Sequence, residues 1–508
     1  MEGRAFALRL LVILFTVALI GFWAEAALEF SLATDPVTGQ PLQFSHLQVT
    51  TEMVRAAASP MCRAYNNILA LLLTFIALAI PITANLYTPK LIEIFIRDRI
   101  NLFVLCGCVL LTAHSILVAA LAFDRWPGQF RYWIDCLGAV IGWVVLLPYY
   151  FYVLGFLNPV TIIKRVHRSL MEELEDATRG KYPVAVAQQR VNQRIINLGS
   201  VLLRAVDRAD RDVTFDAIRT HMLELVRVRN VKLRLPADFF KVNNSLMIGM
   251  SSDGTDIVSE SGIWMEYRIV NHLILAYRTA AAKMSDGASA LAHAVKNAAH
   301  DEACRHNDAV YYLLVRTLNS FMREAIKKKE NAPVFNAVYN YKTLARRLLS
   351  DRPELVPELA RHLFYYANFA RSQGLGFIYE LISYELAELV ELAFQREAAP
   401  SQILLDTLLQ LHGSDQHLGL IKSRAILGAY FLEHGRTADL ARLEASLARV
   451  STTMLVRARD EIVNTRERLF WEVTDRATNF DYVADARREW VNKLFDQLEH
   501  TATQSVIP

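Results

Sequence analysis

Three side chains that can bind a transition metal recur at helical spacing in the second half of the chain: His293, His300 and Cys304. Separations of seven and four residues place all three on one face of a helix. Imidazole nitrogen and thiolate sulfur are ligands that zinc prefers. A complete site needs further ligands from a second element, and without one the better interpretation is that these residues are ordinary surface or interhelical side chains. The spacing therefore provides metal candidates, while the sequence predicts neither a bound metal nor a cofactor.

A second stretch is similar to part of an enzyme loop. An apolar run leads into Asp253-Gly254-Thr255, as in phosphatases whose nucleophilic Asp lies two residues before that motif. This chain has Ser251 at that place, and covalent phosphoryl transfer of this type needs a carboxylate. The chain also lacks a phosphate-binding loop and a nucleophile elbow, so we expect no enzyme. The apolar run and its polar turn instead predict a hairpin or an ordered loop over Asn243–Ser261.

His114 lies near the middle of a long apolar run, where ionisable side chains are costly and often functional. It can relay a proton, bind a ligand or hydrogen-bond a neighbouring helix, and a neutral packing histidine is the alternative. Asp135 and Glu25 lie close to the ends of their runs, so we expect both to reach the outer interface. Thr83 and Asn85 make the end of another run hydrophilic. With His114 they mark the path that a channel or transporter would use.

Apolar runs must position these side chains. Three of them occupy residues 66–87, 102–123 and 134–157. Each approaches the roughly 20 apolar residues with which a helix crosses about 30 Å of hydrocarbon. A fourth run predicts a membrane helix at residues 6–28. The alternative there is a cleaved signal peptide, because Ala24-Glu25-Ala26 has the small-x-small pattern of a cleavage site. We therefore predict four transmembrane helices.

Basic residues set the orientation, because cytoplasmic loops of membrane proteins are enriched in Lys and Arg. They gather after the second and the last predicted helix: Lys90, Arg97 and Arg99, then Lys164, Arg165 and Arg168. Both groups should lie inside and anchor the chain to anionic lipid headgroups. Both termini are then cytoplasmic, and the chain is a multi-pass protein of the cell inner membrane. The loop of residues 29–65 faces out. Its residues 47–58 predict a short amphipathic segment on the outer surface, and a plain extracytoplasmic loop fits equally.

One part of the chain resembles a group of known sequences. A helix end of Thr88-Pro89-Lys90 is followed by an apolar-x-Arg-Asp-Arg turn, Phe95-Ile96-Arg97-Asp98-Arg99. With the order of the helices, the pattern over about residues 66–169 resembles an uncharacterised family of predicted bacterial integral membrane proteins, a domain of unknown function. The resemblance implies an inner-membrane protein with a cytoplasmic tail. It implies no activity.

Beyond residue 158 the sequence becomes charged and its apolar residues recur at helical spacing. Helices are predicted over Pro159–Thr178, Val184–Asp207 and Asp212–Val228, and helical pattern then runs from Ile263 almost unbroken to about His500. Helix, glycine turn, helix units such as Ala429–Leu440 favour a degenerate α-solenoid, and a non-repetitive helical bundle fits equally. The composition thus divides the chain into a transmembrane domain (1–157), a juxtamembrane region of helices and loop (158–260) and a cytoplasmic helical domain (261–508).

The overall composition narrows the class of protein. The 508 residues include 55 Lys and Arg against 52 Asp and Glu, a balance that argues against nucleic-acid binding. The five cysteines lack the paired spacing of a disulfide framework, as in a reducing cytosol. The sequence therefore predicts an all-α membrane protein whose cytoplasmic domain is a scaffold for a protein partner or a sensor of the membrane state. A channel or transporter is the rival function, and a homo-oligomer is left open.

Overall fold

The computed structural model describes residues 13, 16–25, 27–28, 51–86, 95–96, 98–120, 129–242, 244–412, 417–448, 450–470 and 478–504. The chain divides into two compact units, Met1–Arg165 and Val166–Pro508. All of the regular structure in these residues is helical, apart from one isolated bridge between Leu469 and Thr478. The prediction of an all-α chain is confirmed.

Three long helices make up most of the first unit. They are α2 (Thr51–Leu86), α4 (Arg99–Ala120) and α5 (Gln129–Leu157), and each packs against the other two. Each contains a stretch long and apolar enough to cross a membrane: Glu52–Leu78, Arg99–Ala120 and Tyr132–Leu157. Three of the four predicted apolar helices are thus present. In place of the fourth, the described residues show a shorter apolar helix, Thr16–Glu25, and much of the predicted range 6–28 lies outside them.

Helix α2 begins earlier than its sequence pattern indicated. Residues 51–58, predicted as part of a separate surface segment, run without a break into the apolar helix. The reason lies in one side chain: Val54 is buried in a cluster with Phe22 and Val118. Burial of Val54 against two other helical segments holds this stretch in the bundle, so the prediction of a separate segment is wrong.

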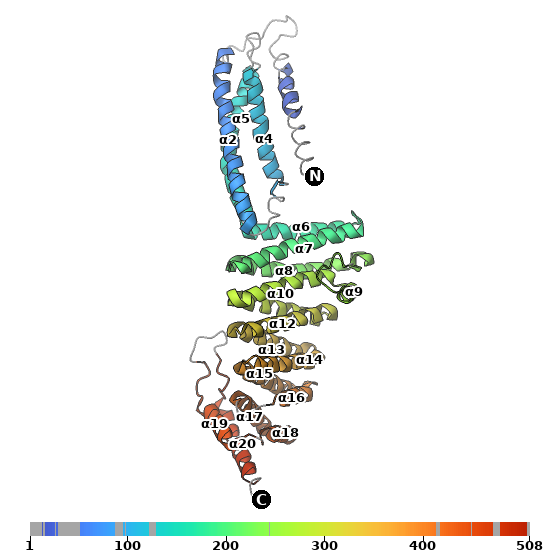
Figure 1. Ribbon diagram of the computed structural model, residues 1–508, viewed down its shortest axis with the longest axis vertical. Coiled ribbons are helices and arrows are strands. Elements are labelled where there is room, and N and C mark those ends of the chain that lie inside the picture. Colours follow the sequence, from blue (N-terminus) through green and yellow to red (C-terminus); the bar gives the residue numbers. More distant parts are fainter. Residues whose placement is uncertain are drawn as a thin grey trace. The chain divides into compact units, whose positions relative to one another are not determined.

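The second unit is a succession of helices that stack in order along the chain (Figure 1). Helix α6 (Pro159–Thr178) runs across the division between the units, and the others are α7 (Val184–Asp207), α8 (Arg211–Lys232), η1 (Ala237–Phe240), α9 (Ser252–Glu260), α10 (Trp264–Lys283), α11 (Ser285–Cys304), α12 (Asp308–Lys328), α13 (Asn331–Asp351), η2 (Pro353–Leu355), α14 (Val356–Ser372), α15 (Gly376–Gln395), α16 (Ser401–Leu409), α17 (Leu418–Glu433), α18 (Thr437–Leu447), α19 (Thr452–Asn464) and α20 (Asp485–Gln504). The predicted bounds of α6 and α7 are confirmed, and α8 is somewhat longer than predicted.

From α10 to α15 each helix of this unit packs against its chain neighbour and against the helix after next. Thus α11 contacts α12 and α13, and α13 contacts α15, which contacts α17. The second row follows the same rule, since α10 contacts α12 and α12 contacts α14. Stacked rings of Tyr277 and Phe321, with centroids 4.0 Å apart, join α10 to α12 in the core. Helices before and after residue 260 share this packing, because α7 lies against α10.

The predicted hairpin or ordered loop is present only in part: residues 244–250 form turns and bends, but the stretch around Asp253-Gly254-Thr255 is helical. It forms the first turn of α9, and Ser251 is its N-cap: the Ser251 Oγ accepts a hydrogen bond from the Gly254 N–H at 3.2 Å. Serine at this position satisfies an otherwise unpaired amide. An acidic residue in the first turn stabilises the helix by its interaction with the positive end of the helix dipole. The polar residues that resembled a turn are therefore a capped helix start.

Helical pattern also fails between α19 and α20. The described residues 465–470 and 478–484 are not helical, although the sequence predicted helix almost throughout. These residues make long-range contacts instead: the Tyr384 hydroxyl donates to Asp481 at 2.5 Å, and Arg488 donates to the Thr465 carbonyl at 2.8 Å. The contacts hold the stretch against α15 and α20, and its residues form one side of a cavity.

Candidate functional site

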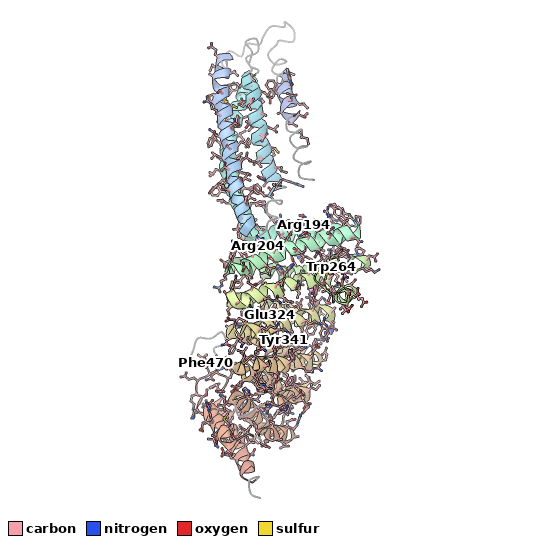
Figure 2. The ribbon with its side chains drawn as sticks, viewed as in Figure 1. Arg194, Arg204, Trp264, Glu324, Tyr341 and Phe470 are labelled. Atoms are coloured by element: carbon pink, nitrogen blue, oxygen red, sulfur yellow. The ribbon has the colours of Figure 1, made fainter. Side chains whose placement is uncertain are left out.

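A cavity of about 460 Å³ lies in the second unit, within the size range of ligand pockets. It opens where α13, α15 and α17 begin, beside the non-helical stretch after α19. The residues that line it come from four separate parts of the sequence: Asn331, Ala332, Phe335, Phe377, Glu380, Leu381, Tyr384, Gly419, Lys422, Phe470, Thr478, Asn479, Phe480 and Asp481. Phe470, labelled in Figure 2, comes from the stretch after α19.

Aromatic rings form the walls of this pocket. Phe335 of α13 and Phe377 of α15 meet with ring centroids 5.3 Å apart, and Tyr384 and Phe480 meet at 5.5 Å. Phe377 is 57% exposed, an unusual position for a large apolar side chain next to a cavity. Exposed aromatic rings at the edge of a concave site are typical of surfaces that bind an apolar group.

A partly buried ion network closes one side of the pocket. Lys422 is only 7% exposed, and its Nζ lies 2.5 Å from Asp481 Oδ2 and 3.0 Å from Glu461 Oε2. The other oxygen of Asp481 accepts the hydrogen bond of Tyr384. Burial and the nearby Asp481 raise the pKa of the Tyr384 hydroxyl well above its ordinary value, so the hydroxyl stays a donor. The network ties residues 478–481 to α15 and α17.

Glycine at position 419 makes room for an acidic side chain at the rim. A Cβ on Gly419 would lie 2.6 Å from Glu380 Oε2 and 2.8 Å from the Glu380 Cβ. Any larger residue would therefore displace Glu380. His417 Nδ1 lies 3.6 Å from Glu380 Oε1 and is the cationic partner when protonated. The lining contains two acidic residues, Glu380 and Asp481, and one basic residue, Lys422, which gives it an excess of negative charge.

The first unit contains a polar cluster centred on His114. Its Nδ1 lies 2.7 Å from Asp135 Oδ1, and its Nε2 lies 2.7 Å from Glu25 Oε2. A neutral imidazole has one N–H, so two carboxylate contacts at this distance require one further proton, on the ring or on an acid. Asp135 is 1% exposed and its side chain turns inward to His114. That Asp135 lies at the level of the outer interface stays a prediction. Glu25 also faces His114. An ion pair between these two side chains would offset part of the free-energy cost of burying them.

The remaining polar candidates of the first unit do not join this cluster in the described residues. Thr83 is buried in α2, and the Asn85 side chain lies outside the described part of the chain. A cavity of about 420 Å³ in this unit has apolar and aromatic walls, and neither His114 nor Thr83 lines it. Its lining comprises Leu71, Leu72, Phe75, Trp143, Leu146, Leu147, Tyr149 and Tyr150.

The basic residues chosen as lipid anchors fall into three groups. Arg99, Lys164 and Arg168 are exposed, and Lys90 and Arg97 lie outside the described residues. Arg165 is partly buried: its guanidinium lies 3.8 Å from the centre of the Phe156 ring and 3.6 Å from Asp98 Oδ2. The Arg165 side chain therefore contacts other residues of the first unit, Phe156 and Asp98.

The metal candidates are only partly brought together. His300 and Cys304 of α11 meet Asp351, the last residue of α13. His300 Nε2 lies 2.7 Å from Asp351 Oδ2, and Cys304 Sγ lies 3.7 Å from His300 Nε2 and 3.9 Å from Asp351 Oδ2. His293 is elsewhere, with its Nδ1 3.4 Å from Lys296 Nζ. A shared helical face thus did not suffice to select the cluster.

Comparisons with known proteins add little to this geometry. No protein-family model matches the chain, and no curated protein matches it significantly. A solved structure titled "Circular tandem repeat protein with novel repeat topology and enhanced subunit contact surfaces" is similar at 12% sequence identity and a TM-score of 0.29, over 90% of this chain and 98% of that chain. A likeness at that TM-score carries no argument about function. The resemblance to bacterial membrane proteins remains an expectation.

Sequence reasoning missed the aromatic pocket. Phe335, Phe377 and Phe480 are far apart in the chain, and the first two fit the apolar pattern of a helix core. The one local signal was Phe480-Asp481, where an aromatic and an acidic residue stand next to each other outside a strong helical period. Only the packing of α13, α15 and α17 gathers these rings at one place.

Proposed function

We propose that the chain is a multi-pass inner-membrane protein whose cytoplasmic helical unit binds a segment of a protein partner in the aromatic pocket. The observation that carries this proposal is the cavity of about 460 Å³ bounded by rings and by the Lys422 network. A scaffold of this kind needs a docking place on a rigid support, and helices α13, α15 and α17 provide that support.

The apolar side chains of the first unit support a membrane setting. Phe103 on α4 is 81% exposed and Val144 on α5 is 65% exposed. Exposed apolar surface in water costs about 25 cal/mol per Å², and hydrocarbon removes that cost. We propose that α2, α4 and α5 span the inner membrane together with a first helix at residues 6–28, and that both termini are cytoplasmic. Lys164 and Arg168 then lie at the level of the inner headgroups.

The second unit is proposed to be a degenerate α-solenoid. From α10 to α17 its helices form two rows in which each contacts the next helix of its row, the arrangement by which helical repeats build a continuous core. Such proteins bind partners on extended surfaces. A bilayer-anchored solenoid would present its pocket to the cytosol, as a scaffold or as a sensor of a membrane-bound partner.

The chemistry of the pocket indicates what the partner segment contains. Rings of Phe335 and Phe377 favour an apolar or aromatic side chain. The acidic excess favours a neighbouring Lys or Arg, because the charge of Lys422 is already neutralised by Glu461 and Asp481. A cation over an aromatic face adds about 0.5–2 kcal/mol. We therefore propose an apolar segment with a basic residue beside its anchoring side chain.

A channel or transporter is the second candidate, and the His114 cluster favours it. An imidazole between Asp135 and Glu25 is a group that can take up and release a proton at membrane depth. Vesicles that contain the purified protein are placed under an imposed pH gradient. Acidification of their interior that is lost in His114→Gln would support this function. A proton flux no greater than that of empty vesicles would reject it.

Site-specific photo-crosslinking tests the docking proposal. A photoreactive phenylalanine analogue replaces Phe377 in the full-length protein, and the matched control replaces Ile403, which is 51% exposed on α16 and does not line the pocket. We expect irradiation of intact membranes to give an adduct at position 377 and none at 403. Mass spectrometry should place the crosslink in an apolar segment with a Lys or Arg, and Glu380→Gln should reduce its yield.

Three outcomes would contradict the proposal. They are equal labelling at positions 377 and 403, a crosslink to a second copy of the chain, and a segment without the expected basic residue. The second of these would instead make the pocket a contact between copies.

A further inference from the structure

Two helices of the second unit bring three different metal-binding side chains together at the molecular surface. His300 and Cys304 lie one turn apart at the end of α11, and Asp351 ends α13. Their donor atoms all lie within 4.8 Å of one another. We propose that these residues form an open transition-metal site that takes Zn²⁺, with water completing the coordination. This inference is independent of the proposed function.

The distances fit a metal of this size. With Zn–N and Zn–O bonds of about 2.0 Å and a Zn–S bond of about 2.3 Å, tetrahedral ligand atoms lie roughly 3.3–3.5 Å apart. Cys304 Sγ is 3.7 Å from His300 Nε2 and 3.9 Å from Asp351 Oδ2. The 2.7 Å between His300 Nε2 and Asp351 Oδ2 is a hydrogen bond that widens when the metal replaces its proton. Small side-chain rotations therefore suffice.

The backbone that carries the ligands is already fixed. Residues four apart on a helix face the same side, so α11 presents His300 and Cys304 together. Helices α11 and α13 pack directly against each other, which holds Asp351 opposite that face. Binding would therefore join two packed helices without rearranging either. Because Cys304 and Asp351 are exposed, the remaining coordination position faces solvent, as in an exchangeable site.

The charges of the surroundings also fit. A thiolate and a carboxylate supply two negative charges, which balance a divalent ion. Arg352 follows Asp351 in the chain, but its guanidinium has other partners. Its NH1 donates to the Ala303 carbonyl at 2.8 Å and lies 2.9 Å from His306 Nδ1, and it also pairs with Glu354. The guanidinium of Arg352 is thus held by groups other than the three proposed ligands.

Cobalt is the probe that tests this site. Full-length protein in detergent is stripped with a chelator, dialysed and titrated with Co²⁺ alone. We expect the visible absorption of tetrahedral cobalt and a thiolate charge-transfer band at one equivalent, with Zn²⁺ displacing both. Cys304→Ser should abolish the charge-transfer band. His300→Gln and Asp351→Asn should each weaken binding by roughly tenfold or more, the scale on which even outer-shell changes act.

His293→Gln provides the matched control, because His293 lies on the same helix but outside the cluster. It should bind Co²⁺ as the unaltered protein does. A charge-transfer band that survives Cys304→Ser, or equal losses in His293→Gln and His300→Gln, would overturn the proposal. So would Co²⁺ absorption no stronger than that of a solution without protein. Circular dichroism of each variant shows that a loss of binding is not a loss of folding.

Discussion

Gly199 of α7 lies directly against the imidazole ring of His272 on α10. A Cβ at position 199 would overlap several atoms of that ring. This close approach lets α7 and α10 pack tightly and leaves His272 almost without exposed surface. Its ring also meets that of His221 on α8, with centroids 6.3 Å apart. Three helices therefore converge on two buried imidazoles.

Gly199→Ala should destabilise the second unit. The added methyl group cannot fit beside His272 unless the helices separate or the ring moves, and overpacking of this kind costs about 1–3 kcal/mol. Gly376→Ala is the control, because the nearest atom to a methyl group at that position, His417 Cε1, would be 3.7 Å away. Thermal unfolding followed by circular dichroism should show a lower midpoint for the first variant than for the second. Equal midpoints would contradict the packing argument.

The buried histidines should make stability depend on pH. Burial lowers the pKa of His221 to about 4, and burial together with His221 lowers the pKa of His272 to about 3. Both rings are then neutral in the folded chain and charged in the unfolded chain below the ordinary value of about 6.5. The free energy of unfolding should fall as pH decreases from about 6.5 towards 4. Denaturant titrations at several pH values should show that the free energy of unfolding of His221→Gln depends less steeply on pH. An unchanged pH dependence would refute this prediction.

Glu224 should act in the opposite direction. Burial raises its pKa to about 7, and the facing His167, whose Nδ1 lies 3.4 Å from Glu224 Oε1, lowers it only in part. A raised folded pKa stabilises the protonated form, so this contribution is complete below about 4.5 and is lost as pH rises through 7. Glu224→Gln should therefore gain stability relative to the parent chain between pH 5 and 8. Denaturant midpoints at several pH values measure the difference between the two proteins. If the midpoints of both change with pH in the same way, Glu224 does not contribute as proposed.

The helices could be predicted from sequence because their causes are local. Helix α7 starts just after Pro183, and its buried Val191, Ile195 and Leu198 recur at helical spacing. The same logic failed at Ser251, where a serine and an acidic residue can begin a helix or a turn. The burial of Val258 and Thr255 against the rest of the unit favours the helix. A local sequence pattern that suits both a helix start and a turn therefore does not show which of the two forms.

The candidate sites depend on contacts between distant segments, which periodicity does not encode. Asp351 joins Cys304 across 47 residues, and Asp481 joins Lys422 across 59. A helical face selected His293 with His300, yet only His300 and Cys304 lie together with Asp351 of the partner helix. His114 was found because an ionisable group in an apolar run is rare, whereas its pairing with Asp135 required the packing of α4 against α5.

Lys422→Met should loosen the stretch that borders the aromatic pocket. The change leaves Asp481 and Glu461 without their shared cation, and removing one partner of a largely buried pair costs about 2–4 kcal/mol after allowance for the exposure of the acids. Trypsin should then cut more rapidly after the exposed Arg466. Lys493→Met, which breaks the exposed pair with Glu489, is the control and should leave cleavage unchanged. Equal cleavage rates in the two variants would mean that the network does not hold the stretch.

Asp135→Asn and His114→Leu should separate the two roles of the polar cluster. The amide of Asp135→Asn keeps a polar contact to the imidazole and removes a buried charge, so this variant should lose little thermal stability in detergent. Leucine at position 114 leaves Asp135, which is 1% exposed, and Glu25 without the group that bridges them, and an uncompensated buried charge costs about 3–5 kcal/mol. The double variant His114→Leu with Asp135→Leu should regain most of this loss, because the fully buried acid is gone and the remaining unpaired acid, Glu25, has a side chain that is 24% exposed. A double variant less stable than His114→Leu would show that the cluster contributes packing and not charge compensation.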